Sequence, residues 1–153
     1  LEGTWVDESD GERVVSSFSW SVNQAFLVRS INRDADGEVA RVGTQIIGWD
    51  PRSQQIRSWS FNADGSFGDA AWSQVENDWI VKSSETLPDG SAASGTYLIS
   101  PVDENSLTMR LMGVEVEGQP QPASKPVTIV RVPETAEAPA DTVPLTPVQP
   151  AGR

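Results

Sequence analysis

The chain has 153 residues, a formal net charge of −11 at pH 7, and neither cysteine nor histidine. This length fits one domain. The composition excludes disulfides, thiol nucleophiles and Ser-His-Asp triads, and it removes the usual ligands of zinc and haem. The acidic balance argues against a nucleic-acid partner, and no run approaches the roughly 20 apolar residues of a membrane span. We therefore expect a soluble protein without a cofactor or metal, and its location, which includes an extracytoplasmic one, is left open.

Short β-rich runs separated by turn signals fill residues 3–132. Apolar and aromatic residues recur with a period of two, as Val14, Phe18 and Trp20 do on one strand face. Turn pairs such as Asp64-Gly65 separate the runs. We expect about ten strands, near residues 3–7, 12–20, 24–33, 38–49, 54–61, 66–74, 78–87, 91–101, 106–117 and 125–132.

The connections between these strands are too short for crossover helices, so neighbouring strands should pair antiparallel as a meander. An open sheet of this width would leave two edges exposed, which favours a closed barrel over a sandwich. The sequence therefore predicts an all-β barrel, a closed antiparallel meander of about ten strands over residues 1–132. Beyond Val132 proline recurs, and this composition predicts a disordered Pro-rich tail over residues 133–153.

The first and last predicted strands carry a pair of residues that resembles a known signature. Gly3-Thr4-Trp5 in the first strand and Arg131 in the last resemble the calycin signature of lipocalins and fatty-acid-binding proteins. The resemblance implies that Trp5 and Arg131 close one end of the barrel, with the guanidinium within about 6 Å of the indole. The helix that follows the barrel in lipocalins is missing. The resemblance therefore favours a lipocalin-like barrel over a true lipocalin.

A second resemblance lies in the middle of the chain. The runs GTQIIGWDP (43–51), IRSWSF (56–61) and DGSF (64–67), followed by Trp72, resemble an uncharacterised domain of planctomycete-type bacterial proteins. In those proteins the domain follows a SnoaL-like domain. The resemblance covers most of residues 1–132 and implies an accessory role beside an upstream SnoaL-like partner, without an assigned reaction.

The aromatic and arginine residues give the candidate binding residues. The tryptophans can either line a cavity or fill the barrel, and the sequence leaves open which face of strand 54–61 points inward. Arg29, Arg57 and Arg110 are either anchors for a ligand carboxylate, as in fatty-acid-binding barrels, or partners in surface ion pairs. The candidate ligand-binding residues are Trp20, Arg57, Trp59, Phe61, Trp72, Tyr97 and Arg110.

No set of residues indicates catalysis or metal binding. Asp34, Asp36 and Glu38 lack the spacing of a calcium loop, so we interpret them as an ordinary hairpin turn. We therefore expect a non-catalytic accessory domain or one that binds a small apolar molecule. Two alternatives remain: a cofactor-free isomerase or cyclase that uses a buried carboxylate, and a structural module that supports a SnoaL-like domain.

Overall fold

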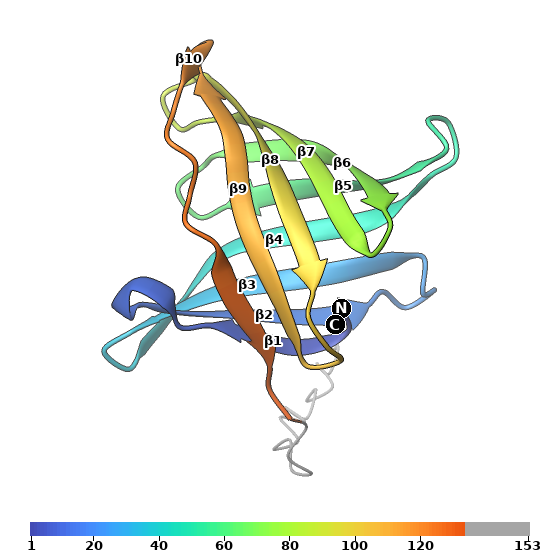
Figure 1. Ribbon diagram of the computed structural model, residues 1–153, viewed down its shortest axis with the longest axis vertical. Helices are drawn as coiled ribbons and strands as arrows, with labels where there is room; N and C mark the ends of the chain where they lie inside the picture. The colour runs from blue at the N-terminus through green and yellow to red at the C-terminus, as the bar shows by residue number, and fades with distance from the viewer. Residues whose placement is uncertain (134–153) are drawn as a thin grey trace, which may run out of the picture.

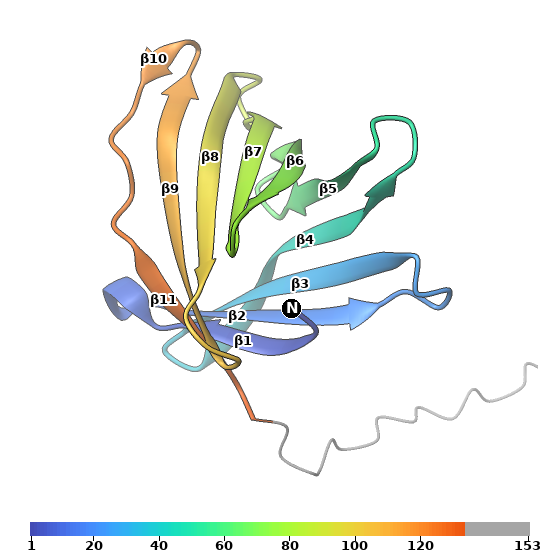
Figure 2. The same ribbon diagram turned by 45° about the vertical axis from the view of Figure 1, so that its right-hand side comes forward.

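A computed structural model describes residues 1–133 as an antiparallel sheet that closes into a barrel (Figures 1 and 2). Each strand from β1 to β9 pairs with the next, and β11 pairs with both β9 and β1, so ten strands form the closed barrel. The strands are β1 (Gly3–Asp7), β2 (Arg13–Trp20), β3 (Phe26–Ala35), β4 (Glu38–Asp50), β5 (Gln55–Asn62), β6 (Phe67–Val75), β7 (Asp78–Thr86), β8 (Ala92–Pro101), β9 (Ser106–Val116), β10 (Gln119–Pro120) and β11 (Val127–Arg131).

The predicted all-β antiparallel barrel of ten strands is confirmed. The two-residue strand β10, which pairs with β9, was not predicted, and β11 is shorter than the expected 125–132. Pro122 and Pro126 explain the gap between them, because a proline has no N–H to donate to a ladder. The predicted disordered tail spans residues 133–153, and all of it except Pro133 lies outside the described residues.

A short 3-10 helix, η1 (Ser9–Gly11), separates β1 from β2 and was also not predicted. The Oδ1 atom of Asp7 accepts hydrogen bonds from the backbone N–H and the hydroxyl of Ser9, at 2.8 and 2.6 Å. These bonds turn the chain locally and end the β1 ladder. The predicted strand at 12–20 therefore begins in the structure at Arg13.

The segment around Asp34, Asp36 and Glu38 is the hairpin turn that the sequence predicts. Ala35 is the partner of Glu38 across the β3–β4 ladder, so only Asp36 and Gly37 form the loop. Both loop residues have positive φ, at 54° and 85°, as the favoured two-residue hairpin turns require.

The first and last strands, β1 and β11, close the barrel through Trp5 and Arg131. These residues are direct partners across the β1–β11 ladder, and the guanidinium carbon lies 4.3 Å from the indole centroid, within cation–π range. Gly3 has φ of +103°, and a Cβ added there would lie 3.0 Å from Nη1 of Arg131. Glycine is therefore required both by the backbone and by the approach of the arginine.

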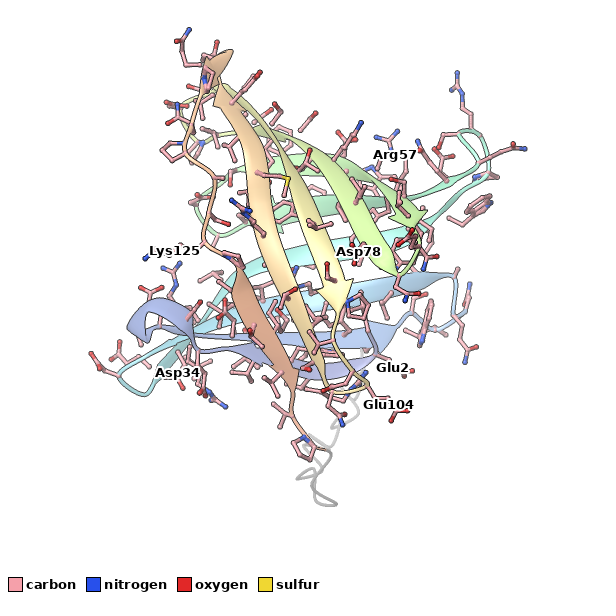
Figure 3. The ribbon with its side chains drawn as sticks, in the orientation of Figure 1. Glu2, Asp34, Arg57, Asp78, Glu104 and Lys125 are labelled. Atoms are coloured by element: carbon pink, nitrogen blue, oxygen red, sulfur yellow. The ribbon has the colours of Figure 1, made fainter. Side chains whose placement is uncertain are left out.

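Few side chains are fully buried, although the barrel is closed. Ser58 is the most buried at 1% exposure, and most interior side chains keep intermediate exposure. The labelled residues Asp34 and Lys125 lie at the periphery of the barrel (Figure 3). The buried apolar side chains are Trp5, Val6, Leu27, Ile47, Ala70, Val81 and Leu107. The interior is therefore only partly filled by its own side chains.

Candidate ligand-binding chambers

The burial of Ser58 decides which face of β5 points inward. Its Oγ accepts hydrogen bonds from Nε1 of Trp72 on β6 (2.9 Å) and Nε2 of Gln45 on β4 (3.3 Å). Because successive side chains of a strand point to opposite faces, Ile56 and Ser60 share the inner face with Ser58. The outer face of the same strand carries Arg57, Trp59 and Phe61.

A cavity of about 710 Å³ opens at one end of the barrel, and we call it the Trp chamber. Trp72 and Trp79 meet edge to face in its wall, with ring centroids 6.2 Å apart. Trp20 and Trp49 are 48% and 59% exposed. Apolar side chains dominate the lining, and the volume is in the usual range for small-molecule sites. Five tryptophans line the chamber: Trp5, Trp20, Trp49, Trp72 and Trp79.

A second interior space of about 300 Å³ has a more polar lining, and we call it the polar chamber. Trp72 and Ile99 line both chambers and so separate them. A small void of about 40 Å³ also touches these two residues, together with Trp5 and Arg29. The polar groups of the polar chamber come from Arg29, Gln45, Ser60, Asn62, Asp69, Ser83, Glu85 and Tyr97, of which Asp69 and Glu85 also line the outer groove described below.

Arg29 of β3 is the centre of a hydrogen-bond chain through the interior. Its Nε and Nη2 atoms donate to Oγ of Ser16 at 3.1 and 2.9 Å, and Nη1 donates to Oε1 of Gln45 at 3.5 Å. The guanidinium carbon also lies 5.4 Å from the ring centroid of Phe18. Gln45 continues the chain to Ser58. All of these partners of the guanidinium are neutral.

Burial changes the acid–base behaviour of three residues that line the polar chamber. Desolvation lowers the pKa of Arg29. Desolvation, followed by the charge of Glu85, raises the pKa of Tyr97. Glu85 is half-buried, and desolvation, followed by the charge of Asp64, raises the pKa of its carboxyl. The chamber thus combines a cation, a phenol and a carboxyl in surroundings that disfavour charge.

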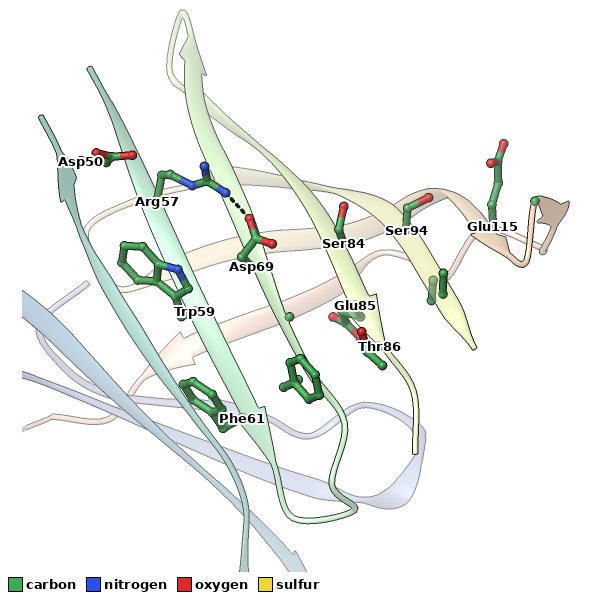
Figure 4. A pocket seen from close by; sticks show the side chains of 15 residues that line it. Asp50, Arg57, Trp59, Phe61, Asp69, Ser84, Glu85, Thr86, Ser94 and Glu115 are labelled. Atoms are coloured by element: carbon green, nitrogen blue, oxygen red, sulfur yellow. Dashed lines mark hydrogen bonds and ion pairs between the residues drawn. The ribbon is translucent and has the colours of Figure 1, made fainter. Parts of the chain in front are cut away.

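A groove of about 710 Å³ runs along the outside of the barrel (Figure 4). Arg57 and Asp69 form an ion pair in it, and Nε of Arg57 is buried without a hydrogen-bond partner among the described residues. Trp59, Phe61 and Phe67 are 37%, 55% and 51% exposed on the same face. We call this the outer groove.

The structure divides the predicted ligand-binding residues into three places. Trp20, Trp72 and Tyr97 line the interior chambers. Arg57, Trp59 and Phe61 line the outer groove and do not reach the interior. Arg110 is exposed, and its Nε donates to the carbonyl of Ser124 at 3.3 Å, so it does not reach the chambers either. The predicted residues therefore do not form a single site.

Three interior residues were not predicted, namely Ser16, Gln45 and Glu85, and Ser58 was predicted only as part of one of the two possible inward faces of its strand. Their side chains are short or polar, and only the registration of neighbouring strands brings them together. The sequence contained a signal for Ser16, because period-two alternation puts it on the same strand face as Phe18 and Trp20. In the structure this face of β2 points inward, and Ser16 is the partner of Ile31 on β3. No comparable signal distinguishes Glu85 from the other acidic residues of the sequence.

No known protein family and no curated protein matches this chain. Within residues 1–133 no helix is long and apolar enough to cross a membrane. The same part of the chain contains no group of three or more acidic, histidine or cysteine side chains that is placed to hold a metal ion. The functional argument therefore depends on the chambers themselves.

Proposed function

We propose that the barrel is a non-catalytic binding or accessory domain that takes a small, mostly apolar molecule into the Trp chamber. The observation that carries this proposal is the chamber itself, about 710 Å³ of space lined by five indoles. A barrel with a purely structural role gains more stability by filling such a space with its own side chains. Each ligand methylene that leaves water for an apolar wall contributes roughly 0.8 kcal/mol.

Fluorescence titration tests this proposal, because the chamber contains most of the indoles. Fatty acids and aromatic acids are added to the protein, and a saturable quenching or blue shift is expected. Trp49→Ala removes one indole from the chamber, and Trp59→Ala removes one from the outer groove as a matched control. Loss of one aromatic contact of about 1–2 kcal/mol weakens binding by roughly 5- to 30-fold.

The expected weakening is confined to Trp49→Ala, and Trp59→Ala should bind like the unmodified protein. Equal weakening in both variants would place the ligand outside the Trp chamber. The absence of saturable binding for every acid in the panel would refute the proposed function.

A second candidate function is a cofactor-free isomerase or cyclase, and Glu85 is the observation that favours it. Its carboxyl lines an interior chamber, and desolvation raises its pKa, as is common for catalytic acids and bases. The test is turnover of a bound ligand by the unmodified protein and by Glu85→Gln. Turnover that disappears in the variant while binding remains would establish the enzyme and reject a non-catalytic role.

Support of a SnoaL-like partner domain stays a prediction. The exposed aromatic residues of the outer groove give such a partner an apolar surface to contact. This role is compatible with ligand binding, because the groove and the Trp chamber are lined by different residues.

A further inference from the structure

The outer groove carries two rows of side chains that run side by side across the sheet, one mostly polar and one mostly apolar. We propose that this groove binds an extended aliphatic polyamine, with its ammonium groups against the polar row and its methylenes against the apolar row. This is a second site, because the outer groove and the Trp chamber have no lining residue in common. The polar row consists of successive cross-strand partners on β5 to β9: Trp59, Asp69, Ser84, Ser94 and Glu115.

The first step is the spacing of the two carboxylates in the polar row. Residues directly opposite each other on neighbouring strands share a face of the sheet, and Figure 4 shows Asp69, Ser84, Ser94 and Glu115 in one line across the groove. Neighbouring strands are about 4.8 Å apart, so three spacings separate the strands of Asp69 and Glu115 by about 14 Å. The two carboxylates therefore mark the ends of an elongated site, and two serine hydroxyls lie between them.

The second step is the apolar row, which lies two residues further along the same strands. Phe61 is the partner of Phe67, and Thr86 continues the row from Phe67 to Ala92. The rings of Phe61 and Phe67 are 55% and 51% exposed, and Trp59 at the head of the polar row is 37% exposed. Aromatic faces attract ammonium groups and give the methylenes between them an apolar surface. The two rows thus match the alternating chemistry of a polyamine.

The third step is charge complementarity. The acidic residues that line the groove are Asp50, Asp69, Glu85 and Glu115, whereas Arg57 is its only basic residue among those described. Arg57 is bound to Oδ2 of Asp69. Oδ1 of Asp69 and both carboxylate oxygens of Glu115 have no hydrogen-bond or ion-pair partner within residues 1–133. The chain as a whole has a formal charge of −11, which attracts cations and repels anionic ligands.

The same geometry favours a polyamine over a compact monocation. An aliphatic chain with an ammonium group at each end reaches both carboxylates, and its inner nitrogens can donate to the serine hydroxyls. A single ammonium ion contacts only one end of the row. On the other side of the polar row, Arg57, Ala71 and Lys82 are successive cross-strand partners. Their two positive charges confine a polycation to the space between the polar and apolar rows.

The test compares two diamines by isothermal titration calorimetry of the whole chain. In extended 1,10-diaminodecane the nitrogens are about 14 Å apart, from bond lengths near 1.5 Å, whereas 1,4-diaminobutane has the same charge and is too short to reach both carboxylates. We expect the long diamine to bind about 10- to 100-fold more tightly, because it gains a second charged contact and additional methylenes on the aromatic rings.

Glu115→Gln removes the carboxylate at the far end of the polar row. It should weaken binding of the long diamine about 3- to 10-fold and change that of the short diamine by less than about twofold. Glu38→Gln is the matched control, since it removes an equal charge from the exposed turn between β3 and β4. It should leave both affinities within about twofold, because solvent and salt screen a distant surface charge.

Trp59→Ala and Trp49→Ala locate the bound diamine. Trp59→Ala should weaken binding of the long diamine about 3- to 10-fold, and Trp49→Ala, which alters the Trp chamber, should leave it unchanged. Equal affinities for the two diamines in the unmodified protein would refute the proposal, and this is the result expected if the groove serves only to contact a partner domain. Equal weakening by Glu115→Gln and Glu38→Gln, or weakening by Trp49→Ala alone, would also refute it. None of these results would overturn ligand binding in the Trp chamber, which is tested with different ligands.

Discussion

Substitution of Ser58 by alanine tests how the barrel interior is held together. The Ser58 hydroxyl accepts hydrogen bonds from Nε1 of Trp72 and Nε2 of Gln45, and the residue is 1% exposed. Ser58→Ala deletes the acceptor and leaves two interior donors unpaired. The change in side-chain volume is small, so the expected loss of stability comes from hydrogen bonding and not from a cavity.

The magnitude follows from the cost of an unsatisfied donor, about 1–3 kcal/mol for each buried group. Gln45 lines the polar chamber, where its amide has room to turn, so the indole of Trp72 contributes most of the cost. We expect a total loss of about 2–4 kcal/mol. For a domain of this size, such a loss lowers Tm by roughly 6–15 °C.

The assay is equilibrium unfolding in urea followed by tryptophan fluorescence, which gives the midpoint and the slope m. Ser60→Ala is the matched control, since Ser60 is the next inward residue of β5 and makes no side-chain hydrogen bond to another described residue. It should change the free energy of unfolding by less than about 0.5 kcal/mol. A loss below about 0.5 kcal/mol for Ser58→Ala, or equal losses for the two variants, would show that this network does not stabilise the barrel.

Four further outcomes are expected. Gly3→Ala should lower the free energy of unfolding by about 1–2 kcal/mol in a urea titration, because alanine disfavours the positive φ and would crowd Arg131. Arg131→Met should cost about 2–3 kcal/mol in the same assay, since it removes the cation–π contact with Trp5 and hydrogen bonds to two backbone carbonyls. Glu85 has a raised pKa, so its charged form destabilises the fold at neutral pH. Glu85→Gln should therefore raise Tm at pH 7, with a difference that vanishes below its ordinary pKa of about 4.3. Asp64 has a lowered pKa because the hydroxyl and N–H of its turn bond its carboxylate, so Asp64→Ala should lower Tm at pH 7. That difference should shrink as pH falls through about 4, and a constant difference down to pH 2 would contradict the assignment.

Local patterns in the sequence determined the strands and the way in which they connect. Period-two alternation and pairs such as Asp36-Gly37 define where a strand runs and where the chain reverses, because both depend on neighbouring residues only. Short connections then require antiparallel neighbours. Strand order in a closed meander predicted that the first and last strands pair, and the resemblance to the calycin signature predicted that Trp5 and Arg131 meet there.

Tertiary structure alone decided which residues share a site. The two faces of β5 differ by a single residue of register, and only the burial of Ser58 places Arg57, Trp59 and Phe61 on the outside. Arg29 resembles the other arginines of the chain until the closed barrel desolvates it and leaves it without a carboxylate partner among the described residues. Desolvation and cavity volume depend on all ten strands at once, so local sequence patterns do not contain them.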